Sequence, residues 1–201
     1  PKGSVRSVPK RLHGAGGDVV GGVSQFMDSA TLKAEIGGAF GSLMTPIEGR
    51  IRSLSVDQSN GFHLSNRGDL TIESTDDAFK SNGDVGIMGT GALVIDGSVI
   101  VTGDLTLTSG IGFDVTLAQA INVNNGDLTV TSGKDLVLTH HVTSGPDLRT
   151  EGINSLAILR AQNQIDFGAD YVIQTDTGVF RVFPLVENTT FFVKPQDMGG
   201  S

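Results

Sequence analysis

The chain has no cysteine and no tryptophan, and only one of its 201 residues is a tyrosine, Tyr171. Without cysteine, it can form neither a disulfide framework nor a thiol-based metal site or nucleophile. Aromatic residues make up 5% of the chain, whereas glycine occurs 28 times and adds no side chain to a core. We therefore expect that one copy cannot bury its own strands, and we predict an oligomer that completes its core between copies.

Long apolar runs are also missing. No stretch of about 18 apolar residues occurs, so we expect no membrane-spanning helix. The first residues lack the apolar segment of a signal peptide, and we expect none there.

Acidic residues are absent from residues 1–13, although the net charge of the whole chain is −8. This end and the glycine-rich "GAGGDVVGG" that follows predict an extended arm over residues 1–27. Residues 1–13 contain four Lys and Arg residues with no aromatic residue between them. This is too little positive charge to indicate nucleic-acid binding, and we expect no direct nucleic-acid partner. We predict instead that the arm anchors on an acidic protein surface through Lys2, Arg6, Lys10 and Arg11.

Residues 28–61 show apolar residues at steps of four and three, the period of an amphipathic helix. Thr45, Pro46 and Glu48 have the residue types of an N-cap, a first helical position and a capping box. The pattern predicts two short helices, at about 29–36 and 46–54. A trimeric coiled coil is the alternative, and the glycines within the stripe count against it.

From about residue 62 the apolar period falls to two, which is typical of strands with one buried face. Asp96-Gly97 stands between two β-branched runs and predicts a hairpin, as does "TDTG" at 175–178. These turns favour antiparallel pairing.

A nearly identical octapeptide occurs twice, as "GDLTLTSG" at 103–110 and "GDLTVTSG" at 126–133. Gly-x-Leu text recurs at separations of 23, 12 and 23 residues, beginning at Gly68, Gly91, Gly103 and Gly126. We interpret the repeat as a strand-and-turn module of about 12 residues, which defines a β-repeat region over 62–145. The spacing leaves open whether this region winds as a β-helix or packs as a sandwich.

Residues 146–201 lose the repeat text but keep the alternation, and half of the ten phenylalanines lie there. Because this end holds the heavier side chains, we predict a compact, better packed C-terminal β block.

Patterns that indicate catalysis or a metal site are few. Adjacent His140 and His141 would point to opposite faces of a strand, so one chain cannot place both on one ion, although three copies could each contribute one. The glycine-aspartate pairs occur in turns, where a carboxylate ordinarily bonds a backbone amide. We predict no enzymatic activity, no cofactor and no metal.

The text "GALVIDGSVIVTGDLTLTSG" and "NGDLTVTSGKDLVLT" resembles the Gly-x-Leu-x-Val repeats of tailed-bacteriophage fibres and capsid-decoration (cement) proteins. The resemblance covers about residues 62–145. It implies a trimeric structural protein of the virion whose N-terminal arm attaches to the particle. Bactofilin-like polymers share similar text, but the predicted helical segment and the aromatic C-terminal block disfavour them.

These observations together predict a mainly β trimer with an N-terminal arm, short helices, an antiparallel β-repeat region and a β-rich C-terminal block. We expect it to bind and stabilise a bacteriophage capsid, with the major capsid protein or another virion protein as its partner. A phage tail or head fibre, with the capacity to bind glycans, is the alternative.

Overall fold

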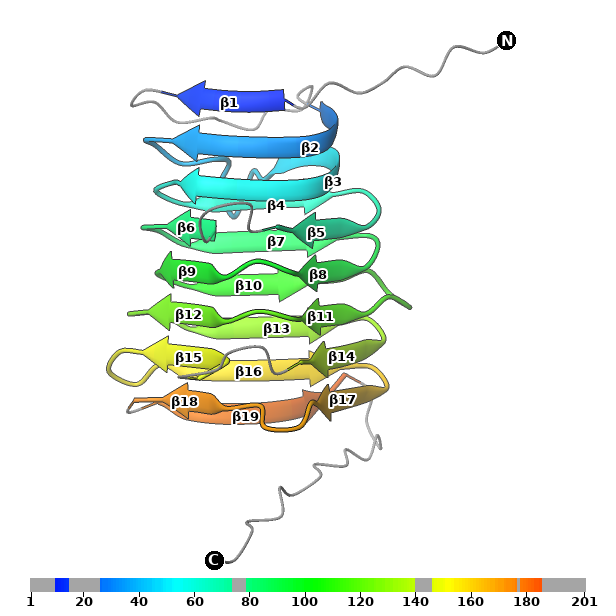
Figure 1. The fold of residues 1–201 in the computed structure, drawn as a ribbon, viewed down its shortest axis with the longest axis vertical. Helices are drawn as coiled ribbons and strands as arrows, with labels where there is room; N and C mark the ends of the chain where they lie inside the picture. The colour runs from blue at the N-terminus through cyan, green and yellow to red at the C-terminus, as the bar shows by residue number, and fades with distance from the viewer. Residues whose placement is uncertain (1–9, 15–25, 74–78, 140–145, 177, 186–201) are drawn as a thin grey trace, which may run out of the picture.

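The structure is a computed structural model that describes residues 10–14, 26–73, 79–139, 146–176 and 178–185. Within these residues every helix or strand is a β-strand, and the strands stack into a column with β1 at one end and β17 to β19 at the other (Figure 1). The short helices expected from the sequence are therefore wrong.

The strands, in chain order, are β1 (Lys10–Gly14), β2 (Phe26–Ile36), β3 (Ile47–Gln58), β4 (Phe62–Asn66), β5 (Leu70–Ile72), β6 (Phe79–Ser81), β7 (Val85–Gly89), β8 (Leu93–Ile95), β9 (Val99–Thr102), β10 (Leu105–Thr108), β11 (Val115–Leu117), β12 (Ile121–Asn124), β13 (Leu128–Ser132), β14 (Asp135–Leu138), β15 (Leu148–Glu151), β16 (Leu156–Ala161), β17 (Gln164–Phe167), β18 (Ile173–Thr175) and β19 (Val179–Pro184).

From β4 onward, each strand pairs in parallel with the strand three places further along the chain, as in a β-solenoid. One face holds β4, β7, β10, β13, β16 and β19, and a second holds β5, β8, β11, β14 and β17. The third face is a separate five-stranded sheet of β6, β9, β12, β15 and β18. The long strand β3 pairs with both β4 and β5 and so joins the first two faces. We call each turn of three strands a rung.

The parallel stacking corrects the predicted antiparallel repeat region. Asp96-Gly97 is not a hairpin turn, because β8 before it and β9 after it lie in different sheets. The segment 175–178 likewise separates β18 from β19, and β19 pairs in parallel with β16. At both places the chain turns a corner of the column and continues around it, so a turn signal in the sequence does not distinguish a corner from a hairpin.

The repeated octapeptides lie directly on one another. Leu105 of β10 pairs with Leu128 of β13, and Leu107 pairs with Val130 in the same register. The 23-residue spacing is therefore one complete rung of three strands, not the pair of modules that the sequence suggested. Stacking in register places apolar side chains on apolar side chains and threonine on threonine.

The segment predicted to be helical forms β2 and β3. Steps of four residues fit a strand as well as a helix, provided that the position between them also points inward. Ala34 and Gly49 occupy such inward positions and are buried, while Glu35 and Arg50 beside them are exposed. Because Ala34 and Gly49 are small, an analysis that counts only large apolar side chains misses the period of two.

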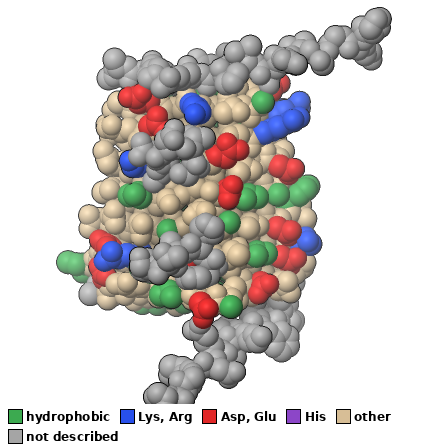
Figure 2. Space-filling view, viewed as in Figure 1, with side chains coloured by type: hydrophobic (Ala, Val, Ile, Leu, Met, Phe, Trp, Pro, Cys, Tyr) green, Lys and Arg blue, Asp and Glu red, His purple; other side chains and the backbone are tan. Residues whose placement is uncertain are grey.

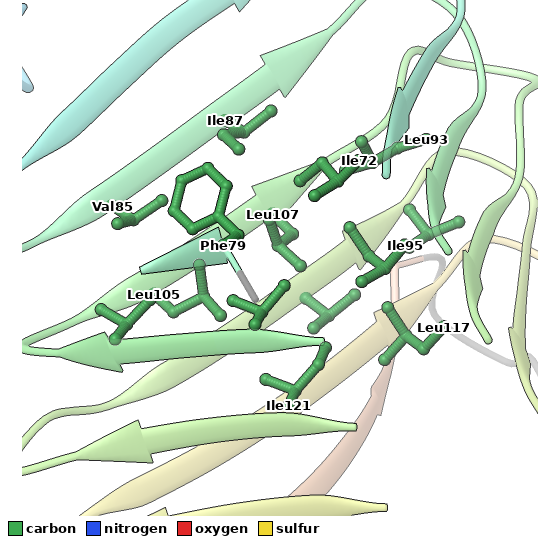
Figure 3. Close-up of a cluster of buried hydrophobic side chains, with 14 of the residues drawn as sticks. Ile72, Phe79, Val85, Ile87, Leu93, Ile95, Leu105, Leu107, Leu117 and Ile121 are labelled. Carbon is green, nitrogen blue, oxygen red and sulfur yellow. The ribbon is translucent and has the colours of Figure 1, made fainter. Parts of the chain in front are cut away.

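Alternate residues of every rung point into the column and form one continuous core (Figure 3). Leu105, Leu107 and Ile87 are at most 1% exposed. Near the N-terminal end, Phe40 stacks on Phe62 with ring centroids 4.4 Å apart, and Phe79 meets Phe62 edge-on at 5.5 Å. One chain thus buries its own strand faces, and the sequence-based reason for an oligomer does not hold.

Gly103-Asp104 and Gly126-Asp127 lie at the corner where the third face passes into the first. A Cβ atom at Gly126 would overlap the carbonyl oxygen of Gly103 in the rung before it, so successive rungs can meet here only without side chains. The Asp104 carboxylate accepts the N–H of Asp127 at 2.9 Å, and Asp84 accepts the N–H of Asp104 at 3.0 Å. These corner carboxylates link one rung to the next.

The C-terminal rung is less well buried than the rungs before it, so the better packing predicted for residues 146–201 does not extend to β19. Phe180 of β19 is 36% exposed although its partner in the register, Ala157, is fully buried. Bulky side chains do not ensure burial here, because among the described residues no rung covers β19 from beyond.

Candidate functional site

The predicted anchoring residues lie only partly within the described residues. Lys10 and Arg11 belong to β1, which pairs in parallel with β2 so that they stand opposite Leu32 and Lys33. Lys2 and Arg6 lie outside the described residues. Residues 10–14 are therefore a strand of the column, and the anchoring role of the four basic residues stays a prediction.

The aspartates of the repeats act on backbone amides, as the sequence indicated. Asp69 Oδ1 accepts the N–H of Ala92 at 2.9 Å, and Asp127 Oδ1 accepts that of Leu156 at 2.8 Å. These amides belong to the next rung and not to the same turn, which the sequence did not indicate. Among the described residues, no group of three or more side chains could hold a metal ion. His140 and His141 lie outside the described residues.

Two further polar side chains, Tyr171 and His63, are partly buried. The Tyr171 hydroxyl is buried and has no hydrogen-bond partner among the described residues, and burial is the main reason that its pKa is raised. His63 of β4 packs over Gly86 of β7, where a Cβ atom would lie 2.8 Å from His63 Nδ1. Burial lowers the pKa of His63, and the charge of Asp84 acts weakly in the opposite direction. Within the described residues, neither side chain is hydrogen-bonded to another side chain that could act with it in catalysis.

The most distinctive polar feature is a hollow of about 450 Å³ at the corner where β3 bends and β4 passes into β5. Figure 2 shows Lys and Arg side chains gathered near one end of the molecule, at the edge that β3 rounds in Figure 1. We call this feature the arginine hollow. It is lined by Arg50, Arg52, Arg67, Gly68, Asp69 and Thr71.

Alternation along β3 places two of the arginines. Arg50 and Arg52 flank Ile51, which is fully buried in the core, so both point outward on the same side of the strand. Both are exposed, and neither forms an ion pair within the described part of the chain. Their charges are therefore available to a ligand.

A buried amide holds the two sides of the hollow together. Asn66 is 1% exposed, and its Oδ1 accepts the N–H of Ile51 at 2.7 Å while its Nδ2 donates to the carbonyl oxygen of Ile51 at 3.0 Å. The same Nδ2 reaches the carbonyl oxygen of Gly68 at 3.2 Å. Asn66 thus fixes the backbone between Arg50 and Arg52 against the turn that carries the third arginine.

The third arginine is held by two contacts. Arg67 Nη2 lies 3.0 Å from Glu48 Oε2, and its guanidinium lies 5.0 Å from the ring centre of Phe26. The next residue, Gly68, has a φ of +89°, a conformation that favours glycine, and donates its N–H to Thr90 Oγ1 at 2.9 Å. The turn is therefore tied both to β3 and to the rung below it.

Sequence reasoning missed the arginine hollow because it placed residues 46–54 on a helix. Two residues apart on a helix, Arg50 and Arg52 would point to different sides, whereas on a strand they share one side. The alternation in "RIR" at 50–52 was the available signal for that pair. Arg67 joins them only through the stacking of β4 on β3, which no local pattern reveals.

Comparisons with family models, with curated proteins and with solved structures found no match. Among the described residues, no helix has the length and apolarity needed to cross a membrane.

Proposed function

We propose that this protein is a structural component of a bacteriophage virion that decorates and stabilises the capsid. The observation that carries the proposal is the uniform column itself. Its rungs repeat one architecture, with an apolar core inside and threonine-rich strands outside, and the glycine-aspartate corners join each rung to the next. The repeat sequence also resembles that of virion proteins, which supports a bacteriophage particle as the assembly.

Rigidity is the property that this architecture provides. Each rung is joined to the next by parallel backbone ladders on three faces and by a continuous core, so bending the column breaks many contacts together. Such a column suits a part that holds neighbouring subunits at a fixed distance. This structural role requires neither a moving element nor a reactive group.

Attachment is proposed to occur at the N-terminal end, through Lys2, Arg6, Lys10 and Arg11. β1 lies at one end of the column, so this basic segment joins the body there (Figure 1). Opposite charge on an acidic capsid surface would steer and orient the docking.

Assembly as a homotrimer is part of the proposal, with contacts on the outside of the column. Ile111 is 89% exposed and Phe113 is 44% exposed in the segment between β10 and β11. Large apolar side chains exposed close together are typical of association surfaces. Copies would therefore meet through these residues, while each chain keeps its own core.

A phage fibre is the second candidate, and one observation favours it. The strand edges and apolar side chains of the last rung offer a surface on which further β-structure can stack, as in an elongated shaft. Glycan binding would then be expected at the far end of such a shaft.

The test is to locate the chain in particles assembled from the genome that encodes it. Immunogold labelling should mark the whole shell, and shells made without the protein should release their contents at a lower temperature. Labelling confined to tail or fibre tips would support the second candidate. Absence of the chain from purified particles would refute both.

A separate experiment tests attachment and assembly. Replacing Lys2, Arg6, Lys10 and Arg11 with glutamine should abolish binding to purified shells but leave the molar mass by light scattering at three chains. A monomer at working concentration would contradict the trimer, and normal shell binding by the variant would contradict the anchoring role.

A further inference from the structure

We propose that the arginine hollow is a binding site for a phosphate or sulfate ester group. This inference is independent of the virion proposal. It rests on three arginines that line one open hollow, two of which form no ion pair within the described part of the chain.

The charges stand out against the rest of the molecule. The chain carries a net charge of −8, yet three arginines lie together at this one hollow. Glu48 partly neutralises Arg67, and Asp69 has one oxygen occupied by the N–H of Ala92. Arg50 and Arg52 therefore supply the attraction, and Arg67 supplies a fixed third wall.

The hollow is also pre-organised. The buried Asn66 clamps the backbone on either side of Ile51 to the turn at Gly68, so the strand that carries Arg50 and Arg52 does not have to be ordered when a ligand binds. Pre-organised donors raise affinity because less conformational entropy is lost on binding.

The chemistry of the lining selects the ligand class. Guanidinium groups donate paired N–H groups in a planar fork that matches the oxygens of phosphate, sulfate or carboxylate. The hollow of about 450 Å³ falls within the size range of small-ligand sites, yet it lies at an open corner of the column. It therefore suits one or two tetrahedral oxyanions carried by a larger molecule, either a phosphate ester or a sulfated glycan.

The experiment is isothermal titration calorimetry on the full chain at low ionic strength, with pyrophosphate and with sucrose octasulfate as separate probes. Wild type should bind at least one of them. Tighter binding of pyrophosphate would assign the site to phosphate esters, and tighter binding of the octasulfate would assign it to sulfated glycans.

Variants distinguish recognition at the hollow from general attraction. The double substitution R50Q/R52Q should weaken binding by about tenfold or more. Each hydrogen bond from a charged guanidinium contributes more to the binding free energy than a hydrogen bond between neutral groups. The control R160Q/R181Q makes the same change of net charge on β16 and β19, at the other end of the column, and should leave affinity within about twofold of wild type. Unchanged unfolding temperatures would show that both variants keep the fold.

Conservative replacement sharpens the test further. R50K/R52K keeps both charges but removes the planar forks, and it should lose part of the affinity. Three results would overturn the proposal: no binding of either probe by wild type, equal losses in R50Q/R52Q and in the control, or full affinity in R50K/R52K.

Discussion

The central rungs, built from β8 to β13, and the last rung, built from β17 to β19, share one pattern of inward apolar residues but differ in burial. Leu107 in the centre is fully buried, whereas Phe180, which stands opposite the buried Ala157 in the last rung, is 36% exposed. Phenylalanine is larger than leucine, so residue size does not explain the difference. In a solenoid, burial depends on having a rung on both sides.

The comparison also separates two kinds of contact. Within the centre, each inward side chain is covered by the rungs before and after it, and the corner glycines let those rungs approach closely. At the end, aromatic side chains cover one another instead. Phe167 lies 6.5 Å from Phe180 and 6.3 Å from Tyr171 between ring centroids, both edge-on. Such a partly exposed cluster should tolerate change better than the packed interior.

The largest expected difference is between Leu107→Ala and Val182→Ala. Removing the Leu107 side chain leaves a cavity between two fixed rungs and should cost about 3 kcal/mol of unfolding free energy. Val182 is only partly buried, and among the described strands a rung covers it on one side only, so its loss should cost about 1 kcal/mol. Urea unfolding followed by circular dichroism measures both. Equal costs would show that the end is as well packed as the centre.

The corner glycines provide the second comparison. A Cβ atom at Gly133 would overlap the carbonyl oxygen of Gly110, and one at Gly178 would overlap that of Ser155. Gly133→Ala should cost about 1–3 kcal/mol, because rungs on both sides prevent relief of the overlap. Gly178→Ala should cost less, since no described strand packs on the outer side of β19 to resist a small shift. Thermal unfolding of the two variants tests the order, and a more damaging Gly178→Ala would contradict it.

How far the sequence predicts this fold depends on the length of the pattern. The alternation in Leu105 and Leu107, repeated one rung later in Leu128 and Val130, is enough to predict strands and a repeat. It cannot predict their pairing, because a corner and a hairpin use the same turn residues. Asp96-Gly97 is the example: its residue types fit a hairpin, and only the stacking of β8 and β9 on other strands makes it a corner.

The candidate site was less accessible to sequence reasoning than the fold. The basic residues nearest the N-terminus attracted attention because they are close in sequence, whereas Arg67 meets Arg50 and Arg52 only through the pairing of β4 with β3. Asn66, which fixes the hollow, resembles an ordinary polar residue at the end of a strand. Its role depends on being buried, and burial on this corner follows from the solenoid.

A smaller effect is expected from Tyr171→Phe in the last rung. The Tyr171 hydroxyl is buried without a described hydrogen-bond partner, so its removal relieves the cost of an unsatisfied polar group. The variant should be as stable as the wild type or more stable by up to about 1 kcal/mol, while the ring contact with Phe167 remains. A clear loss of stability in urea unfolding would mean that the Tyr171 hydroxyl forms a hydrogen bond in the folded state, and this prediction would be wrong.

The smallest effect concerns His63, near the other end of the column. Burial lowers its pKa in the folded state below the ordinary 6.5, so the unfolded chain takes up a proton first as the pH falls. The stability that neutral His63 provides is complete above pH 6.5 and is lost as the pH falls from there to the lowered pKa. The difference in unfolding free energy between about pH 8 and about pH 5.5 should therefore shrink in His63→Gln. In Asp84→Asn, which keeps the oxygen that accepts the Asp104 N–H but removes the charge that raises the His63 pKa, the same difference should grow. A pH dependence that is identical in the wild type and both variants would show that His63 is as accessible to protons in the folded rung as in the unfolded chain.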